Sequence, residues 1–530
     1  MTKQERKWIW ITSVVIMVIT TIPYILALSV EEDSWKFTGF LFGVEDGNSY
    51  IAKMLTGAYG NWFFTTPYTT YPQKGELAFL PYLLLGKLTS QPGQHAQLVV
   101  LFHFFRILAG CLAIVATYDF ISIFIKKVQV RRFGTLLISI GGGLGWLFLI
   151  GLDGLWGDRL PLEFYSPETF GFLSLYGLPH LALGRACLLW GLCAFFDGNH
   201  PLKNIKFSGM YFVILTLVQP VTAVLGYGLL FLATAGTIFR VWLENRKEKP
   251  SILHISMENG KKLAWIVSFS LPILIYIFVS YKFDPFMQRW EQQNIITSPP
   301  ITDYLLAWGW TIPFVIMAIV KMVKKEIPVQ YFLLAWLLVI FPLIYFPVNI
   351  QRRLAEGVWV AFILLVLLVV ENWKRSKVIL SLLLVFSSLP YISILAGGIK
   401  GALDPFTPVF RPAQEVTVFE KLAQNAHARD VVLASYQISN ALPAWAPVRV
   451  LSGHGPESID ANSINQEVMN FFSDSYSQTE QIQFLMKYEI SYVIWGPDER
   501  ALGEWNPTSS HYLQLIYDAN DYALYKVNTP

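Results

Sequence analysis

Long apolar runs recur along the chain, and they constrain its fold more than any other feature of the sequence. A helix needs roughly 20 mostly apolar residues to cross the hydrocarbon core of a bilayer. The runs predict about 11 transmembrane helices, several of them short enough to need local thinning of the bilayer. They cover Trp8–Ser29, Ala96–Ile125, Phe133–Leu152, Leu181–Phe196, Phe207–Gln219, Val221–Phe239, Leu263–Tyr281, Tyr304–Val323, Val329–Phe346, Val358–Val370 and Val378–Ala396.

The overall composition agrees with a membrane protein. Apolar side chains make up 54% of the 530 residues and charged ones 15%, whereas an ordinary soluble domain has about 25% charged residues. The net charge is only +3, and the basic residues stand in short clusters between the apolar runs. Such a pattern is unlike a nucleic-acid footprint. The composition therefore excludes a soluble globular protein and favours the lipid bilayer, not nucleic acid, as the partner.

The basic clusters predict the orientation of the helices, because loops rich in Lys and Arg stay on the cytoplasmic side. With the N-terminus inside, the cytoplasmic loops hold Lys126, Lys127, Arg131, Arg132, Lys321, Lys324, Lys325, Lys374, Arg375 and Lys377. Val30–Gln94, Asp153–His180, Lys282–Asp303, Val348–Gly357 and all residues after Gly397 then lie outside. We expect a multi-pass plasma membrane protein with a cytoplasmic N-terminus and an extracytoplasmic C-terminal domain.

One short apolar stretch, Leu77–Leu88, does not fit this count as a crossing. It contains Pro81, and a full crossing there would invert the orientation of every later loop. We therefore expect interfacial helices within a first outer loop at residues 30–95. Residues 1–400 would then form the transmembrane domain.

The hydrophobic pattern changes near Gly401 and predicts a second domain at residues 401–530. Helix-like and strand-like periods alternate there, which indicates a small α/β domain. The expected helices are Pro412–Asn425, Ser463–Phe472 and Gln478–Tyr488, and the expected strands are Asp430–Ala434, Arg449–Leu451, Ser491–Trp495, Leu513–Tyr517 and Tyr522–Val527. The predicted fold class is an α-helical polytopic membrane protein with a C-terminal extracytoplasmic α/β domain.

An acidic pair, Glu45 and Asp46, lies near the start of the first outer loop. Just beyond the first span, the pair would face the boundary between membrane and water. Such a site can desolvate one carboxylate and raise its pKa toward the working range of a general base, while the other binds a cation or positions a hydroxyl. A solvated acidic turn is the simpler interpretation, and spacing alone favours it.

The overall arrangement resembles the GT-C superfamily of glycosyltransferases, which includes protein O-mannosyltransferases and bacterial aminoarabinose transferases. The shared features are a long first outer loop with an acidic pair near its start, interfacial helices in that loop, many short spans and a C-terminal outer domain. The resemblance implies inverting transfer of a hexosyl or pentosyl group from a polyprenyl-phosphate-linked donor to an acceptor on the outer face. It carries the catalytic carboxylate over to Asp46 and Glu45 and leaves the acceptor open among glycan, lipid and protein.

Two stretches of the outer domain, Ser452–Glu457 and Tyr488–Gly496, are similar to segments of uncharacterised bacterial membrane proteins of this type. The similarity indicates kinship and does not identify a substrate. The outer domain is expected to handle the acceptor or cover the site, not to carry the catalytic group.

A departing polyprenyl phosphate is an anion, so the implied reaction needs positive charge at the outer membrane surface. Arg352 and Arg353 stand on a short outer loop against the positive-inside trend, which makes them candidates for a phosphate clamp beside Asp46. Snorkelling to lipid headgroups explains them equally well. Arg185, one turn inside a span, is a third candidate, because a basic side chain at that depth needs a partner or a water-filled cavity.

The second outer loop supplies the secondary candidates His180, Glu163 and Asp158. His180 could cap a helix, hydrogen-bond a sugar, or ligate a divalent cation (Mg²⁺ or Mn²⁺) together with Glu45 or Asp46, and capping is the simplest of these roles. The glycine-rich Gly141–Gly145 resembles a nucleotide-binding loop. It lies in an apolar run with no preceding strand, so close helix packing explains it better.

Two other classes of function stay open. A transporter or lipid flippase could use the buried charges Arg106, Asp119 and Arg185 to line a pathway, although the sequence shows neither repeat halves nor paired broken helices. A catalytically inert protein could use its outer domain to bind the cell envelope. A cavity open to lipid and lined by Asp46 and the arginines would favour the transferase.

Overall fold

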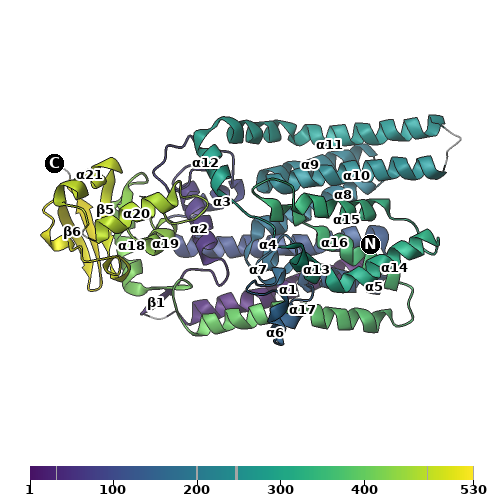
Figure 1. Ribbon diagram of the computed structural model, residues 1–530, viewed down its shortest axis with the longest axis horizontal. Coiled ribbons are helices and arrows are strands. Elements are labelled where there is room, and N and C mark those ends of the chain that lie inside the picture. Colours follow the sequence, from purple (N-terminus) through teal and green to yellow (C-terminus); the bar gives the residue numbers. More distant parts are fainter. Residues whose placement is uncertain (32, 198–200, 245–248, 474, 529–530) are drawn as a thin grey trace. The chain divides into compact units, whose positions relative to one another are not determined.

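The computed structural model describes residues 1–31, 33–197, 201–244, 249–473 and 475–528 (Figure 1). The chain divides into two compact units. The first contains residues 1–21, 105–279 and 295–397, and the second contains residues 22–104, 280–294 and 398–530. Four long helices contribute residues to both units: α1 (Lys3–Ser29), α4 (Gln94–Phe124), α11 (Lys249–Phe283) and α17 (Ser376–Leu403).

Eight helical segments of the described chain are long and apolar enough to cross a membrane. They are Lys3–Ser29, Gln94–Phe124, Pro179–Phe196, Pro220–Trp242, Met257–Phe283, Ile301–Val323, Gln351–Val370 and Ser376–Leu403. Two shorter apolar helices, Asn204–Val218 and Tyr331–Ile344, match two more of the predicted runs. The chain is thus a multi-pass membrane protein.

The predicted span Phe133–Leu152 is wrong as a continuous helix. α5 (Val128–Ile140) ends where Gly141 leaves the helical conformation, and only the short α6 (Trp146–Leu149) follows. The peptide N–H groups of Gly143 and Gly145 donate hydrogen bonds of 2.9 and 2.8 Å to Oε1 of Glu163. The glycines therefore form a loop around a buried carboxylate. Close packing is confirmed as well, because a Cβ atom at Gly143 would collide with the backbone of Ala307 in the helix Ile301–Trp308.

The core of the first unit is α16 (Val358–Val370), all of whose residues are buried. A helix that is apolar on every side is stable only when it is covered all round. α5, α14 (Ile312–Val323) and α15 (Tyr331–Ile344) pack against it. The remaining elements of this unit are α7 (Phe172–Gly177), α8 (Pro179–Phe196), α9 (Pro201–Val218), α10 (Pro220–Glu244), α13 (Ile301–Trp308) and the 3-10 turns η1 (Asp153–Leu155), η2 (Leu162–Phe164), η3 (Gly309–Thr311) and η4 (Gln351–Ala355).

Two helices of the first outer loop, α2 (Val44–Ala58) and α3 (Leu80–Gly86), form one packed pair in the second unit. A Cβ atom added at Gly57 would collide with the backbone of Leu83, and one added at Gly86 would collide with the backbone of Met54. α3 has only seven residues, which is too short to cross a bilayer. α12 (Pro285–Gln293) adds Phe286 and other side chains to an apolar cluster with this loop.

A two-stranded antiparallel pair joins the first outer loop to the C-terminal region within the second unit. β1 (Trp35–Phe37) pairs with β2 (Phe410–Pro412). Hydrogen bonds on either side of the pair, from Thr38 N to Val409 O and from Ala413 N to Ser34 O, continue the contact. The C-terminal region and the loop that precedes α2 therefore share backbone hydrogen bonds.

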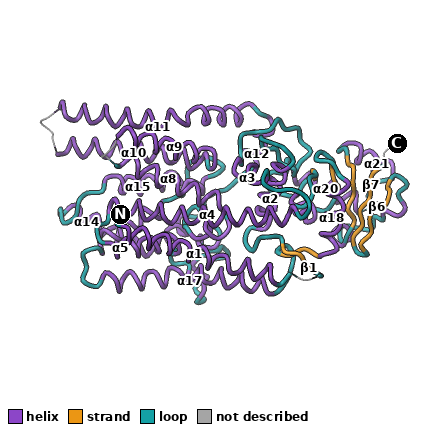
Figure 2. The backbone as a smooth tube through the Cα atoms, turned by 180° about the vertical axis from the view of Figure 1, so that it is seen from behind, coloured by secondary structure: helices purple, strands orange, loops and turns teal. Residues whose placement is uncertain are grey.

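The C-terminal region is built on a five-stranded sheet in the order β4-β3-β5-β7-β6, whose strands are orange in Figure 2. The strands are β3 (Val431–Leu433), β4 (Arg449–Val450), β5 (Ile490–Trp495), β6 (Leu513–Ala519) and β7 (Tyr522–Val527). β4, β3 and β5 run parallel, whereas β7 is antiparallel to both β5 and β6.

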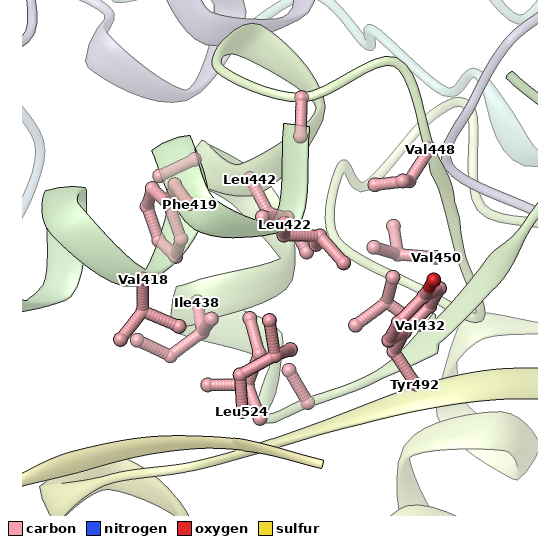
Figure 3. Close-up of a cluster of buried hydrophobic side chains, with 14 of the residues drawn as sticks. Val418, Phe419, Leu422, Val432, Ile438, Leu442, Val448, Val450, Tyr492 and Leu524 are labelled. Carbon is pink, nitrogen blue, oxygen red and sulfur yellow. The ribbon is translucent and has the colours of Figure 1, made fainter. Parts of the chain in front are cut away.

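Helices cover both faces of this sheet. α18 (Ala413–Asn425) and α19 (Tyr436–Ala441) pack on the face that carries Val432, Tyr492 and Leu524 (Figure 3). α20 (Ala461–Phe472) and α21 (Gln478–Lys487) cover the alternate residues on the other face. Every predicted helix and strand of this region is confirmed. The sequence missed α19, the 3-10 turns η5 (Leu442–Ala444) and η6 (Pro507–Ser509), and the short α22 (Pro497–Arg500).

The close approach of α2 and α3 can be tested by adding one methyl group. We expect Gly57→Ala to lower the stability of the protein in detergent by about 1–3 kcal/mol, because the new methyl group meets the fixed backbone of α3. The matched control is Gly228→Ala in α10, where a Cβ atom meets nothing within 4 Å. Thermal unfolding followed by circular dichroism should show a lower midpoint for Gly57→Ala alone; equal midpoints would contradict the packing described here.

Candidate functional site

The acidic pair lies in the first turn of α2. Gly43, immediately before the helix, has φ 57° and ψ 49°, a left-handed conformation that glycine adopts without strain. Glu45 and Asp46 follow as exposed side chains at the helix N-terminus, where the helix dipole favours negative charge. The predicted acidic turn is therefore a helix start, with both carboxylates reachable from solvent.

One face of α2 carries polar side chains at helical spacing. Asp46, Ser49 and Lys53 stand three and four residues apart, so they lie on one side of the helix. Ser49 and Lys53 are buried, whereas Asp46 is exposed at the end of the row. The row leads from solvent into the interior of the second unit.

A loop between β4 and α20 supplies the partners of this row. Its backbone is shaped by Ser458, whose hydroxyl accepts hydrogen bonds from the N–H groups of Gly453 and His454. Asn440 of α19 donates to Gly453 O at 2.8 Å and accepts from Asn48 of α2 at 2.8 Å. α2, α19 and this loop are therefore joined by one set of hydrogen bonds.

His454 lies between two carboxylates. Its Nε2 is 3.0 Å from Oδ1 of Asp46, and its Nδ1 is 3.4 Å from Oε1 of Glu457. An ionised carboxylate only accepts hydrogen bonds, so the Nε2–H group donates a hydrogen bond to Oδ1 of Asp46. The imidazole is buried, with 7% of its side chain exposed, while 56% of the Asp46 side chain is exposed.

Glu457 is held by a buried cation and two hydroxyl groups. Lys53 Nζ is 2.5 Å from Oε1 of Glu457, and the two side chains are 1% and 3% exposed. Ser49 donates to the same oxygen at 2.7 Å, and Thr66 donates to Oε2 at 2.6 Å. The Lys53 ammonium group also lies over the Phe79 ring, 4.5 Å from its centroid. A buried charge pair needs such additional partners to offset its desolvation.

Glu45 is held by different donors from those of Asp46. The hydroxyl of Tyr436 donates to Oε1 of Glu45 at 2.5 Å, and the N–H of Gly455 donates to the same atom at 3.1 Å. Desolvation raises the pKa of the Tyr436 hydroxyl, and its hydrogen bond to Glu45 raises it further. Glu45 therefore accepts from a neutral phenol, while Asp46 accepts from an imidazole.

The expectation of a raised carboxylate pKa in this pair is wrong for Asp46. Desolvation by the surrounding protein raises its pKa, but the hydrogen bond from His454 and the charges of His454 and Lys53 outweigh that effect, so the pKa lies below its ordinary value. Burial likewise raises the pKa of Glu457, yet Lys53 and His454 bring it down to about 2. Both carboxylates are ionised at neutral pH. Asp46 Oδ2 makes no hydrogen bond to any described protein group, so it can accept one from a hydroxyl in solvent.

The predicted arginines lie in the first unit, near a second acidic group. Arg352 in η4 has its Nε atom 3.7 Å from Oε2 of Glu168, and its guanidinium lies over the Tyr165 ring, 5.0 Å from the centroid. Among the described residues this Nε–H has no hydrogen-bond acceptor. Arg353 is its half-buried neighbour in the same turn.

Arg185 in α8 has the partner that its depth requires. Its Nε atom donates to Glu356 at 2.6 Å, and the other two guanidinium nitrogens donate to the carbonyl groups of Phe170 and Pro167. Arg185 therefore organises the loop before α7 and α8 in addition to any contact with a ligand.

The three secondary candidates of the second outer loop have different environments. Burial raises the pKa of Glu163 to about 7 despite the peptide N–H groups of Gly145 and Gly143 that it binds. His180 is half-buried in the first turn of α8, and Asp158 is exposed. Glu163 is an interior carboxyl that closes the Gly141–Gly145 loop.

The buried charges that suggested a transport pathway are engaged by protein groups of the first unit. Arg106 donates to the hydroxyls of Thr20 and Thr21 and to the carbonyl of Leu175. Asp119 accepts from Trp190 Nε1 at 2.9 Å. These contacts join α1, α4, α7 and α8.

Sequence reasoning missed His454, Glu457 and Lys53 as members of the site. The stretch Ser452–Glu457 had been noted only as a sign of kinship. The row of Asp46, Ser49 and Lys53 on α2 could have indicated the site. A lysine on the buried side of a short helix needs a partner of opposite charge. Its partner in the C-terminal region could not be read from spacing, because the two are about 400 residues apart.

Comparison with solved structures identifies the fold. The apo form of the Archaeoglobus fulgidus oligosaccharyltransferase aligns over 97% of this chain and 74% of its own, at 12% identity and a TM-score of 0.54. ArnT from Cupriavidus metallidurans in the apo state aligns over 97% of both chains, at 9% identity and a TM-score of 0.51. The chain has the fold of the GT-C glycosyltransferases.

The mycobacterial arabinofuranosyltransferase AftD also shares the GT-C fold, over 97% of this chain and 41% of its own, at 13% identity and a TM-score of 0.51. A zinc and sulfate complex of the A. fulgidus enzyme has a TM-score of 0.48 to this chain. A scan of protein-family models and a search of curated proteins each found no match. At sequence identities this low, the structural similarity establishes a common fold and does not establish a common activity.

The donor set around Asp46 does not fit a divalent cation. Among the described residues no three His, Cys, Asp or Glu side chains are grouped so as to hold a metal ion. Glu45 and Asp46 each face a protein donor, and the cation beside Glu457 is the ammonium group of Lys53. Mg²⁺ requires octahedral geometry, and here His454 already engages one oxygen of Asp46 while no third protein ligand stands beside the acidic pair among the described residues.

The Lys53–Glu457 pair can be tested by a double-mutant cycle. Lys53→Met leaves an unpaired buried carboxylate and should cost about 3–5 kcal/mol. The double variant Lys53→Met/Glu457→Gln should cost much less than the sum of the two single changes, because no buried charge is left. Lys487→Met breaks the exposed pair with Glu467 and serves as the control, with an expected cost below about 1 kcal/mol. Additive effects in detergent unfolding would show that the two side chains do not interact.

Proposed function

We propose that the protein is an inverting membrane glycosyltransferase that moves a hexosyl or pentosyl group from a polyprenyl-phosphate-linked donor to an acceptor on the outer face. The acceptor is a glycan, a lipid or a protein. Support comes from the GT-C fold, which the chain shares with proteins described as an oligosaccharyltransferase and an arabinofuranosyltransferase. The observation that carries the proposal is the exposed, ionised Asp46 at the start of α2, held on one oxygen by His454.

In this proposal Asp46 is the general base. The acceptor hydroxyl donates a hydrogen bond to Oδ2 of Asp46, and its oxygen attacks the anomeric carbon of the sugar. The bond from that carbon to the phosphate oxygen breaks, the polyprenyl phosphate leaves as an anion, and the hydroxyl proton passes to Asp46. A single in-line displacement inverts the configuration. Glu45, held by Tyr436 and Gly455, orients the same helix start.

Arg352 and Arg353 are proposed to bind the phosphate of the donor. The Nε–H of Arg352 lacks an acceptor among the described residues and Glu168 is 3.7 Å away, so this guanidinium is not fully neutralised. A guanidinium can bind phosphate through two parallel hydrogen bonds. Arg185 is the weaker candidate, because Glu356 and two carbonyl groups already occupy its donors.

The alternatives lose support. Arg106 and Asp119 are engaged by neighbouring protein groups, so neither needs a water-filled pathway. An inert binding protein would have no use for an ionised carboxylate held so specifically at a helix start. We propose no metal-dependent step through Mg²⁺ or Mn²⁺, since the residues around Asp46 do not form a group of ligands for either ion.

The catalytic assignment is tested in membranes supplied with polyprenyl-phosphate sugars. We expect Asp46→Asn to lower the rate of sugar transfer by about 100-fold or more, since the amide cannot accept the proton. We expect Arg352→Ala to lower it by about 100-fold, with partial recovery in Arg352→Lys, if the guanidinium stabilises the departing phosphate. The control Asp404→Asn changes an exposed carboxylate at the end of α17 and should transfer sugar normally. Normal transfer by correctly inserted Asp46→Asn protein would overturn the assignment.

The proposed orientation has the N-terminus in the cytoplasm and the C-terminal region outside. Both Ser509 and Lys324 are exposed, so a cysteine at either position can be labelled. On intact cells a membrane-impermeant maleimide should label Ser509→Cys and leave Lys324→Cys unlabelled until the membrane is opened. The reverse pattern would invert the proposed orientation.

A further inference from the structure

His454 engages one of the two carboxylate oxygens of Asp46, so a metal ion cannot chelate both oxygens while the imidazole is in place. Its Nε2 atom donates to Oδ1 at 3.0 Å, and the imidazole is almost completely buried. A cation that ligates this oxygen would have to displace the imidazole from a site closed by the hydrogen bonds of Ser458 and Asn440. The orientation of Asp46 is therefore set by a protein donor.

A buried ion pair lies on the other side of the His454 imidazole. Its Nδ1 faces Oε1 of Glu457 at 3.4 Å, and the same oxygen is 2.5 Å from Lys53 Nζ. Lys53 is fully buried beneath the Phe79 ring, so its ammonium group cannot leave for solvent without breaking the interior. The negative charge of Glu457 is thus balanced within the protein by the ammonium group of Lys53, without a bound ion.

We propose that His454, supported by Glu457 and Lys53, orients and electrostatically supports Asp46 in place of a divalent cation, so that sugar transfer proceeds without metal. The inference rests on the proposed function of Asp46. It makes His454 a positioning residue that acts through Asp46. It gives the C-terminal region a direct part in a reaction whose proposed base lies in the first outer loop.

The first test uses the unaltered protein. Purified protein in detergent is treated with EDTA, dialysed and assayed with and without added Mg²⁺ or Mn²⁺. We expect the rate of transfer to be unchanged in all samples. The protein is also titrated with Mn²⁺ alone, and bound Mn²⁺ is followed by electron paramagnetic resonance. We expect the unaltered protein and Asp46→Asn to give the same signal, because Asp46 binds no ion. This second readout needs no sugar donor.

The second test separates positioning from folding. Loss of a residue that orients a functional group typically lowers activity by about 10- to 100-fold, and we expect this loss in kcat of His454→Ala with little change in KM for the donor. His454→Gln should recover most of kcat, because its amide N–H can donate to Asp46 from a similar position. Equal thermal unfolding midpoints of the two variants would assign the difference to the donor atom.

The outcomes distinguish this inference from the proposed function. If EDTA abolishes transfer, Mn²⁺ restores it, and Asp46→Asn loses both activity and bound Mn²⁺, then the metal-free inference is wrong, while the protein is still a glycosyltransferase that requires Asp46. If Asp46→Asn transfers sugar normally, the proposed function itself is wrong. If His454→Gln is as slow as a stably folded His454→Ala, a hydrogen-bond donor at this position is not what supports Asp46, and the positioning role is overturned.

Discussion

The buried ion pair between Lys53 and Glu457 is the interaction on which the candidate site depends. Two charges removed from water are costly unless each finds a close partner and further hydrogen bonds. Here Ser49, Thr66 and the Phe79 ring supply those contacts. Because one charge belongs to α2 and the other to the loop after β4, both segments must be in place before either charge is satisfied. The pair therefore couples the first outer loop to the C-terminal region.

The same helix serves both packing and chemistry. At its C-terminal end, α2 approaches α3 so closely that Gly57 and Gly86 have no room for a side chain. At its N-terminal end, Gly43 turns the chain so that Glu45 and Asp46 reach solvent. A rigidly packed helix holds a reactive group more accurately than a free loop does. The electrostatics of Asp46 follow from this placement, since His454 keeps it ionised.

Buried charges elsewhere in the chain follow the same rule. Arg185 is paired with Glu356, Arg106 is held by two hydroxyls and a carbonyl, and Glu163 is capped by the peptide groups of a glycine-rich loop. Each of these contacts pairs a buried polar group that would be costly to leave without a hydrogen-bond partner in an apolar interior. Arg352 differs, because its Nε–H has no acceptor among the described residues. Within the same described chain, Arg132, Arg411 and Arg449 also have an unpartnered guanidinium nitrogen, but Arg352 alone of these four lies on the short loop that the sequence places outside, which makes it the candidate for an anionic ligand.

Local patterns in the chain were enough to predict the apolar helices, the α/β pattern of the C-terminal region and the acidic pair near the start of the first outer loop, because hydrophobic periodicity and composition are local properties. The prediction of a continuous helix failed at Phe133–Leu152. There the N–H groups of Gly143 and Gly145 donate hydrogen bonds to Glu163, and the chain forms a loop although its composition is apolar. The contact of Asp46 with the loop that carries His454 and Glu457 became visible only in the folded chain. Those residues lie about 400 positions from α2, and the pKa of a carboxylate depends on the charges that folding brings beside it.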